Sequence, residues 1–321
     1  MLADYLHNLN PILFEFNESI KIHWYGIAYV LGFLSGYWCL VYLARKQIGV
    51  LEEKELADFI TYAAIFGVLL GGRLGYMLFY VPNEFFANPK TFFYLQNGGM
   101  ASHGGILGLF FFTLYYAWKH KKSWPGLGDN LVSVAPLGLM FGRLANFVNG
   151  ELYGHRAPEG FRYAVRFPSE LHEIQAADPV LFENIRSLLP GVPPNAKVDE
   201  IIAAARTSPE VAQQLYPALT PRHPSQLYEA ALEGLALFLI LFIVRVKFPR
   251  APHGMITGLF FIIYAAFRMF IEKYYRVGDG EILGVSRGFF YSTFMIGIGA
   301  AFIIYALIKG KRDQQNAERL A

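Results

Sequence analysis

The chain has 321 residues, of which 54% are hydrophobic, 17% are aromatic and 17% are charged. Soluble domains carry about 25% charged residues, so the composition disfavours a cytosolic enzyme or a disordered chain and favours a polytopic membrane protein. The formal net charge of +3 gives no basic field for nucleic acid, and the single cysteine excludes an internal disulfide or a Cys-rich metal site.

Seven apolar runs recur along the chain, each long enough to cross ~30 Å of hydrocarbon as a helix. In chain order, the predicted spans are residues 25–43, 57–80, 100–118, 131–148, 226–244, 255–270 and 288–308. We therefore expect an all-α polytopic membrane protein with seven transmembrane helices. An odd number of spans places the two termini on opposite faces of the membrane.

Lysine and arginine gather in alternate loops of this predicted topology. The richer set comprises Arg45, Lys46, Lys54, Lys119, Lys121, Lys122, Arg245, Lys247, Arg250, Lys309, Lys311, Arg312 and Arg319. The short segments on the opposite side, apart from the long segment between the fourth and fifth spans, hold only Lys21, Lys90, Lys273, Arg276 and Arg287. The positive-inside rule then predicts an N-terminus outside and a C-terminus in the cytoplasm. The first twenty residues contain no lysine or arginine, which disfavours a cleaved signal peptide.

A long polar, proline-containing segment separates the fourth and fifth predicted spans, and we expect it to form a small extracytoplasmic head. Within it, residues 199–214 predict a short helix. The expected organisation is therefore 1–150 for the first four helices with their arms, 151–222 for the head, 223–310 for the last three helices and 311–321 for a cytoplasmic tail. Glycine pairs at a spacing of four, such as Gly67/Gly71 and Gly104/Gly108, predict close packing of helices.

Polar groups that are costly in hydrocarbon fall at one depth of the predicted bundle. The topology places them at the outer ends of six spans: His23, Tyr25, Arg73, Ser102, His103, Arg143, Asn146, Asn149, Glu151, Gln226, Glu229, Tyr264, Arg268 and Glu272. The inner halves carry almost no comparable groups. Because such residues are expensive and usually functional, we interpret them as the lining of one polar pocket at the outer face.

The residue types in this pocket suit a phosphate. A guanidinium stays charged and offers phosphate a forked set of donors, and a phospholipid head group is the phosphate normally found at that depth. His103 is the histidine placed clearly within the layer and is a candidate proton acceptor, while Tyr25 and Tyr264 could donate to a developing charge on oxygen. Structural alternatives stay open: Arg268 and Glu272 could form an intrahelical ion pair, and His103 could be an interfacial histidine.

Other chemistries lack their motifs. His172-Glu173 is not followed by a histidine at the spacing of a zinc-protease helix, and no nucleophile elbow or phosphate-binding glycine motif stands in a suitable context. Cys39 lies in the inner half of the first span, so a covalent cysteine enzyme is not expected. We expect neither a metal nor a cofactor.

One run of thirteen residues carries a family resemblance. The sequence GRLANFVNGELYG, from Gly142 to Gly154, resembles the signature of bacterial phosphatidylglycerol–prolipoprotein diacylglyceryl transferases. Further blocks match in the order of that family, and they cover all spans except the last: HWYG at 23–26, GRLGY at 72–76, HGG at 103–105, HPSQLYE at 223–229, and Tyr264, Arg268 and Glu272.

The resemblance implies transfer of the diacylglyceryl group of phosphatidylglycerol to the lipobox cysteine thiol of a prolipoprotein. A thioether would form and glycerol phosphate would leave, in the bacterial cytoplasmic (inner) membrane with the active site near the outer leaflet. The expected partners are phosphatidylglycerol, the prolipoprotein signal peptide and membrane lipids, with no nucleic acid. Because the substrate supplies the thiol nucleophile, the enzyme needs no cysteine of its own.

The resemblance also implies residue roles. Arg143 would bind the donor phosphate, Arg268 would face the leaving group or the thiolate, and His103 is the candidate base, although it could instead orient the head group. The expected catalytic residues are His103, Arg143, Arg268, Tyr25 and Tyr264. The expected substrate-binding residues are Arg143, Asn146, Glu151, Gly154, Arg73, Glu229 and Glu272.

Some features depart from the family pattern. Residues 182–220 make the head longer than expected, Ala145 stands where glycine is frequent, and Val277-Gly278-Asp279 lacks a proline that often precedes the aspartate. The main alternative is a multipass lipid or anionic-solute transporter, which should carry polar groups through the inner half as well. A phospholipid hydrolase would need a positioned water and usually a metal or a second base.

Overall fold

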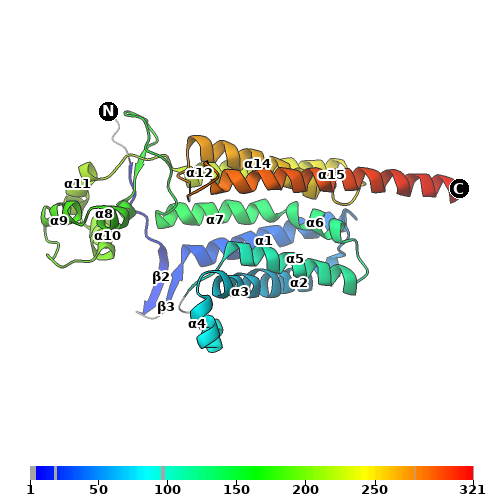
Figure 1. Cartoon of the computed structure of the whole chain (residues 1–321), viewed down its shortest axis with the longest axis horizontal. Coiled ribbons are helices and arrows are strands. Elements are labelled where there is room, and N and C mark those ends of the chain that lie inside the picture. The colour runs from blue at the N-terminus through cyan, green and yellow to red at the C-terminus, as the bar shows by residue number, and fades with distance from the viewer. Residues whose placement is uncertain (1–4, 18–19, 95–97, 279, 321) are drawn as a thin grey trace. The chain divides into compact units, whose positions relative to one another are not determined.

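The computed structural model describes residues 5–17, 20–94, 98–278 and 280–320, and it is mostly helical (Figure 1). Asp279, part of the motif departure noted above, and Ala321 at the end of the expected tail lie outside the described residues. Contacts divide the chain into two compact units, each built from three stretches of sequence. The first unit comprises Met1–Gly32, Pro136–Phe238 and Phe261–Gly297, and the second comprises Phe33–Ala135, Leu239–Phe260 and Ile298–Ala321.

Three small two-stranded sheets belong to the first unit. Strand β1 (Tyr5–Leu6) pairs in parallel with β4 (Val165–Arg166). Strands β2 (Ile12–Asn17) and β3 (Ile20–His23) form an antiparallel hairpin (Figure 1), and β5 (Glu281–Ile282) pairs with β6 (Val285–Ser286).

Helical segments make up most of the first unit. Nine helical segments among the described residues lie in this unit, and only the first residue of α7 falls outside it. They are α7 (Ala135–Asn149), η4 (Pro168–Glu170), α8 (Leu171–Ala177), α9 (Pro179–Ser187), α10 (Val198–Thr207), α11 (Pro209–Leu215), η5 (Tyr216–Ala218), α12 (Ser225–Glu229) and the π-helical segment η6 (Ala230–Ala236). Four long helices contribute to both units: α1 (Trp24–Arg45), α13 (Leu237–Lys247), α14 (Met255–Tyr274) and α15 (Arg287–Leu320).

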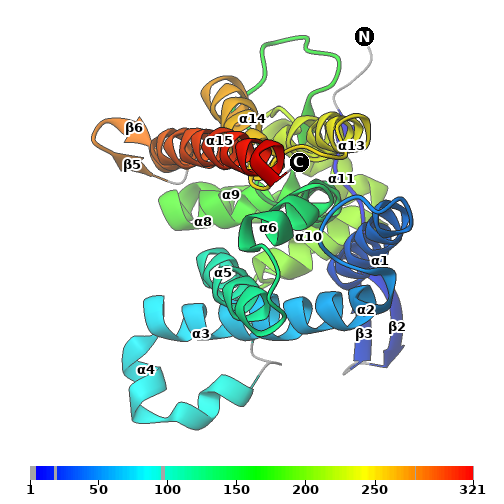
Figure 2. The ribbon, with the colours of Figure 1, turned by 90° about the vertical axis from the view of Figure 1, so that its right-hand side faces the viewer.

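The second unit contains helices joined by loops, with no strand among its described residues. Its remaining elements are α2 (Glu53–Tyr62), the π-helical segment η1 (Ala63–Leu69), α3 (Leu70–Phe79), α4 (Pro82–Ala87), η2 (Pro89–Phe93), α5 (Ser102–Lys119) and α6 (Trp124–Val132). Helices α3 and α5 lie side by side (Figures 1 and 2).

Several helices are long and apolar enough to cross a membrane, which confirms a polytopic membrane protein. Within the described residues there are five, at Trp24–Arg45, Glu53–Phe79, Ser225–Lys247, Met255–Tyr274 and Arg287–Asn316, or six if α6 and α7 form one broken span. Large apolar side chains such as Trp38 and Trp118 are 63% and 77% exposed, as expected for groups that face lipid rather than water. Helix α5, the expected third span, is not among these helices, because Ser102, His103 and Lys119 are polar. The count of seven and the orientation stay predictions.

Two helices that the sequence predicts as continuous are interrupted. The expected span at 131–148 is interrupted at Ser133 and Val134, because Pro136 has no amide hydrogen to continue the helical ladder. The expected helix at 199–214 is two helices, since Ser208 caps α11 and accepts from the Val211 amide at 3.4 Å. Helix α15 continues to Leu320, so the described residues of the expected tail extend the helix of the last apolar run.

Glycines bring α3 and α5 into close contact, as their spacing predicts. A Cβ atom added to Gly71 would lie 2.6 Å from the Gly104 carbonyl oxygen, and one added to Gly75 would lie 2.5 Å from the Gly104 Cα. No side chain fits between backbones at these distances, so the glycines set how near the two helices approach.

The head has an apolar core of its own. Helices α8 to α11 enclose a cluster that includes Phe182, Ile201, Leu215 and Leu219, each at most 2% exposed (Figure 1). Residues 182–220, the stretch that is longer than the family resemblance suggested, therefore supply most of the helices that bury this core.

Candidate active site

Three arginines and three glutamates from α7, α12, η6 and the end of α14 meet in the first unit. Arg143 comes from α7, Glu229 and Glu233 from α12 and η6, and Arg268 and Glu272 from α14, with Arg276 just beyond α14. The spacing of four along α14 places its charged residues on one stripe, so the sequence directs them toward the same neighbours.

Glu229 joins the three arginines. Its carboxylate is fully buried and lies 2.8 Å from Arg143 Nε, 3.2 Å from Arg268 Nη1 and 2.8 Å from Arg276 Nη1. Such a buried carboxylate is stable only when cations surround it. Here it holds two guanidiniums from separate helices, α7 and α14, and a third from Arg276, two residues beyond the end of α14. The predicted proximity of Arg143, Glu229 and Arg268 is confirmed.

Glu272 and Glu233 complete the cluster in different ways. Arg268 donates from Nε to Glu272 at 3.0 Å, so the intrahelical ion pair considered from the sequence is present. Glu272 also accepts from the Gly288 amide at 3.1 Å, at the start of α15. Glu233 is fully buried and lies 3.6 Å from both Arg143 Nη2 and Arg268 Nη1.

Glu233 and Arg276 were not among the site residues expected from the sequence. Arg276 continues the stripe of Arg268 and Glu272, and Glu233 follows Glu229 by four residues, so the spacing could have indicated both.

A second group, of uncharged and acidic residues, lies at the end of α7. Asn146 donates from Nδ2 to Glu151 Oε1 at 2.8 Å, and the Tyr25 hydroxyl donates to the same carboxylate oxygen and accepts from Asn146. The structure therefore brings together Tyr25, Asn146 and Glu151, which the sequence placed at the outer ends of two spans. Tyr264 lies one turn before Arg268 on α14, is half-buried, and interacts electrostatically with Glu233.

The loop after α7 is fixed by the start of α12 and by His223 just before it. Gln226 donates from Nε2 to the Glu151 carbonyl at 2.7 Å, Ser225 donates to the Leu152 carbonyl at 3.1 Å, and the Gly154 amide donates to the His223 carbonyl at 2.9 Å. A Cβ atom on Gly154 would collide with the Tyr275 carbonyl oxygen and lie 2.8 Å from that of His223. Gly154 thus permits the close approach of three backbone segments.

A cavity of about 330 Å³ adjoins both groups in the first unit. Glu151 and Arg276 are among the residues that line it, together with Ser169, His172, Glu173 and Arg222 of the head. Arg222 pairs with Glu170 at 2.6 Å and stacks over the Tyr153 ring at 4.7 Å. Burial, together with a hydrogen bond to Glu173 at 2.7 Å, raises the pKa of Tyr153, so this phenol stays protonated and polar at neutral pH.

Arg73 and His103 belong to the second unit. Arg73 is only 3% exposed, and its guanidinium donates to the carbonyls of Thr91, Phe92, Tyr94, Gly98 and Gly99. All five of its N–H groups are therefore engaged by backbone, which gives Arg73 a part in holding this loop. His103 is exposed in the first turn of α5. Their predicted roles toward substrate stay predictions.

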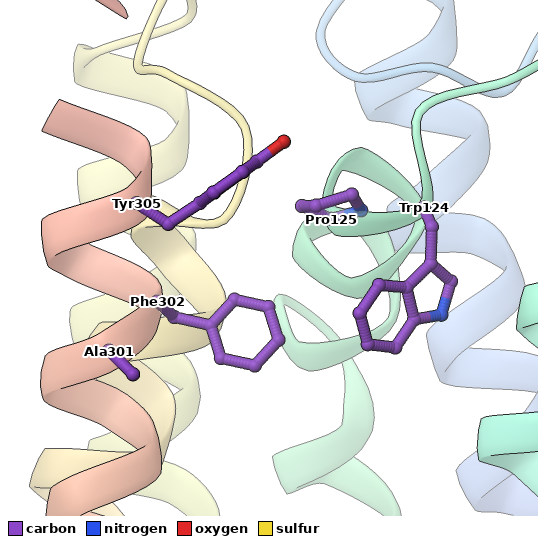
Figure 3. Close-up of a pocket in the computed structure, with 5 residues that line it drawn as sticks. All are labelled: Trp124, Pro125, Ala301, Phe302 and Tyr305. Atoms are coloured by element: carbon purple, nitrogen blue, oxygen red, sulfur yellow. The ribbon is translucent and has the colours of Figure 1, made fainter. Parts of the chain in front are cut away.

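A second cavity, of about 360 Å³, lies in the second unit and is apolar (Figure 3). Phe302 and Tyr305 project from α15 toward Trp124 and Pro125 of α6 (Figure 3). Among the five residues that line it, only Tyr305 has an ionisable group, which is its phenol. This cavity therefore lacks the groups that phosphate chemistry requires.

Comparison with known proteins gives a consistent result. A family model described as prolipoprotein diacylglyceryl transferase matches residues 11–305. The chain is 34% identical to the phosphatidylglycerol–prolipoprotein diacylglyceryl transferase of Bdellovibrio bacteriovorus, over 93% of each chain. It is 35% identical to the protein of the same name from Salmonella paratyphi B, over 98% of this chain and 99% of that one. Both matches cover nearly the whole length, so they include both units of the fold.

Proposed function

The chain belongs to the prolipoprotein diacylglyceryl transferase family, and from this premise we propose that it transfers the diacylglyceryl group of phosphatidylglycerol to a prolipoprotein. The acceptor we propose is the thiol of the lipobox cysteine, and the leaving group is glycerol phosphate. The observation that supports this most directly is the buried carboxylate of Glu229, which fixes the guanidiniums of Arg143, Arg268 and Arg276.

Arg143 is suited to receive the donor phosphate. Its Nε lies beside Glu229, while its terminal nitrogens make no hydrogen bond to any residue that the structure describes. Its side chain is 18% exposed, so the free end of the fork can be reached. A phosphate with two oxygens toward these nitrogens would make the bidentate contact that guanidinium favours.

The reaction we propose is one displacement at carbon. The acceptor thiol loses its proton, its sulfur attacks the glyceryl carbon that carries the phosphate ester, and a C–S bond forms as the C–O bond breaks. The electron pair of the C–O bond stays on the phosphate oxygen, where Arg143 and Arg268 stabilise the growing charge. His103 is the proposed proton acceptor, and Tyr25, Asn146, Glu151 and Tyr264 would orient the lipid head group.

We also propose a topology for this reaction. Seven spans with the N-terminus outside and the C-terminus in the cytoplasm would place the Arg143 cluster near the outer leaflet of the bacterial inner membrane. The excess of Lys and Arg in alternate loops supports this orientation. Prolipoproteins that cross the membrane with their signal peptide still attached could present the cysteine on that side.

The test is a transfer assay in detergent with phosphatidylglycerol labelled in its acyl chains and a synthetic lipobox peptide. The expected result is a labelled peptide whose bond resists thioester cleavage, together with one equivalent of glycerol phosphate. A matched peptide with serine in place of the cysteine should remain unlabelled and release no glycerol phosphate. Release without labelling would instead support a hydrolase, and vesicle-to-vesicle movement of lipid without any product would support a transporter.

A further inference from the structure

Glu233 has no part in the reaction described so far. Its carboxylate is fully buried, and neither oxygen accepts a hydrogen bond from any residue that the structure describes. The cationic atoms beside it are Arg143 Nη2 and Arg268 Nη1, both at 3.6 Å, which is beyond hydrogen-bonding distance. Its neighbour Glu229, in contrast, accepts hydrogen bonds from Arg268 and Arg276.

Burying a carboxylate without hydrogen bonds costs free energy of folding, so stabilising the fold does not explain why Glu233 is there. What Glu233 does provide is negative charge next to the two arginines that we expect to hold phosphate. It provides this charge without accepting a hydrogen bond from their N–H groups, so the terminal nitrogens of Arg143 stay available to a ligand. Glu233 therefore acts on the electrostatic potential of the Arg143 and Arg268 guanidiniums rather than on their geometry.

The charges of the cluster balance before any substrate enters. Arg143, Arg268 and Arg276 carry three positive charges. Guanidinium nitrogens at 2.8 to 3.6 Å favour the ionised form of Glu229, Glu233 and Glu272, which then carry three negative charges. The donor lipid brings a phosphodiester with one negative charge. The product is a phosphomonoester, whose charge at neutral pH is roughly −1.5 to −2. In a site of low dielectric, each added negative charge is repelled by Glu233, and the product is repelled more than the donor.

We propose that Glu233 is a positioning residue that acts through Arg143 and Arg268 and sets how tightly they hold phosphate. Its charge keeps glycerol phosphate from being retained after the C–O bond breaks, at the expense of weaker binding of the donor lipid. This inference rests on the proposed transferase function.

The direct test is Glu233→Gln, which keeps the shape of the side chain and removes its charge. In the transfer assay, the inhibition constant of added glycerol phosphate should fall about tenfold, and the KM for phosphatidylglycerol should fall as well. The kcat should drop several-fold, with a burst of one labelled peptide per enzyme before slow turnover, because product release becomes limiting. Glu233→Asp keeps the charge and should restore an inhibition constant near that of the wild type.

Two outcomes would overturn the proposal. The first is a Glu233→Gln enzyme that folds but binds glycerol phosphate no more tightly than the wild type. A matched control is Glu170→Gln in the head, which removes another buried carboxylate, paired with Arg222, and should leave the inhibition constant unchanged.

The second outcome concerns the wild type alone and holds even if Glu233→Gln does not fold. Glycerophosphoglycerol, the singly charged head group without acyl chains, should inhibit at least as strongly as glycerol phosphate. Inhibition by glycerol phosphate that is about tenfold stronger would contradict a repelling charge at Glu233. If the wild type forms no labelled peptide at all, the proposed function fails instead, so the two failures are distinguishable.

Discussion

Each arginine in the cluster has a different share of its N–H groups committed within the protein. Arg268 uses Nε for Glu272 and Nη1 for Glu229, at 3.0 and 3.2 Å. Arg143 is held beside Glu229 at Nε alone. A guanidinium that is anchored at one end and open at the other is preorganised for an anionic ligand, since little side-chain freedom remains to be lost on binding. Arg143 is therefore the residue whose loss should affect chemistry most.

We expect Arg143→Ala to lower the transfer rate at least about 100-fold, because the positive charge that meets the leaving phosphate is removed. The protein should still fold, which can be checked by its monodisperse elution in detergent. Arg162→Ala, at an exposed position of the head, is the matched control and should keep full activity. Near-normal turnover of the Arg143 variant would contradict the assignment of this residue to phosphate.

Gly154→Ala should reduce both stability and activity, because a methyl group would collide with the Tyr275 carbonyl oxygen and crowd that of His223. We expect a lower midpoint of thermal unfolding and a loss of transfer that Gly154→Ser reproduces. Gly138→Ala on α7 is the matched control, since a Cβ atom there meets nothing within 4 Å. If Gly154→Ala were as stable as the wild type but inactive, Gly154 would contact substrate rather than position the loop.

At the scale of elements, one side chain each holds η2 and the region of β1 in place through hydrogen bonds to backbone carbonyls. Arg73 on α3 holds η2 and described residues beyond it through the backbone carbonyls of Thr91, Phe92, Tyr94, Gly98 and Gly99. His7 holds the strand β1 region, because its Nε2 lies 2.7 Å from the Phe147 carbonyl near the end of α7 and its ring packs against Phe167 at 5.3 Å. Both contacts use one polar group to order a segment with little regular structure of its own.

Arg73→Lys should loosen the segment that Arg73 holds, since one ammonium cannot reach the five carbonyls that the planar fork reaches. Faster amide exchange in peptides that include Thr91 and Phe92, with unchanged exchange in α6, would confirm this. A rise in KM for phosphatidylglycerol without faster exchange would instead support the substrate-binding role expected from the sequence. The exposed Arg162→Lys serves as the control.

His7 should make stability depend on pH. Burial lowers its pKa to about 4, whereas the unfolded chain keeps the ordinary value of 6.5. Between these values the unfolded state binds more protons, so the free energy of unfolding falls as pH falls from 6.5 to 4, by up to about 3 kcal/mol. Thermal unfolding in detergent across this range should show a shallower slope for His7→Phe. The exposed His172→Gln should keep the slope of the wild type.

The sequence predicted elements better than their boundaries. Apolar runs indicated the long helices, and the glycine spacing indicated the contact of α3 with α5, because both follow from the period of a helix. Single prolines and caps decide two interruptions, at Ser133–Val134 and before α11 at Pro209. The pattern of apolar residues continues across both positions, so it did not reveal them. The spacing of Arg268 and Glu272 indicated the cluster of charged residues. Glu233 was missed because its partners lie on other helices, and the sequence does not say how those helices are rotated about their axes.

At the scale of the whole molecule, orientation in the membrane is the property that the sequence addresses most directly. The distribution of Lys and Arg among the loops predicts the orientation. The apolar helices indicate a polytopic membrane protein but not which end of each helix faces the cytoplasm. The expected third span, α5, carries a histidine in its first turn and a lysine at its end, so apolarity alone does not identify it as a span.

A topology experiment tests the proposed orientation. The chain has one native cysteine, Cys39, so Cys39→Ser with Leu188→Cys provides a single thiol on an exposed position of the head. We expect an impermeant maleimide to label it in intact spheroplasts, and a fluorescent protein fused to the C-terminus to fluoresce in the cytoplasm. A head thiol that is labelled only after the cells are broken would place the head inside and reverse the proposed depths.

The wide turns of η6 affect which changes of chain length the fold can accept. Glu229 ends α12, and the seven residues Ala230–Ala236 follow it in π-helical winding, in which each hydrogen bond spans one residue more than in an α-helix. Removing a single residue there would restore the regular winding, and six α-helical residues turn the chain about as far as these seven do. Helix α13 would then present nearly the same stripe to its surroundings while Glu229 kept its arginines. A deletion is therefore tolerated more easily in η6 than in α13, where the loss of one residue would rotate everything beyond it by about 100°.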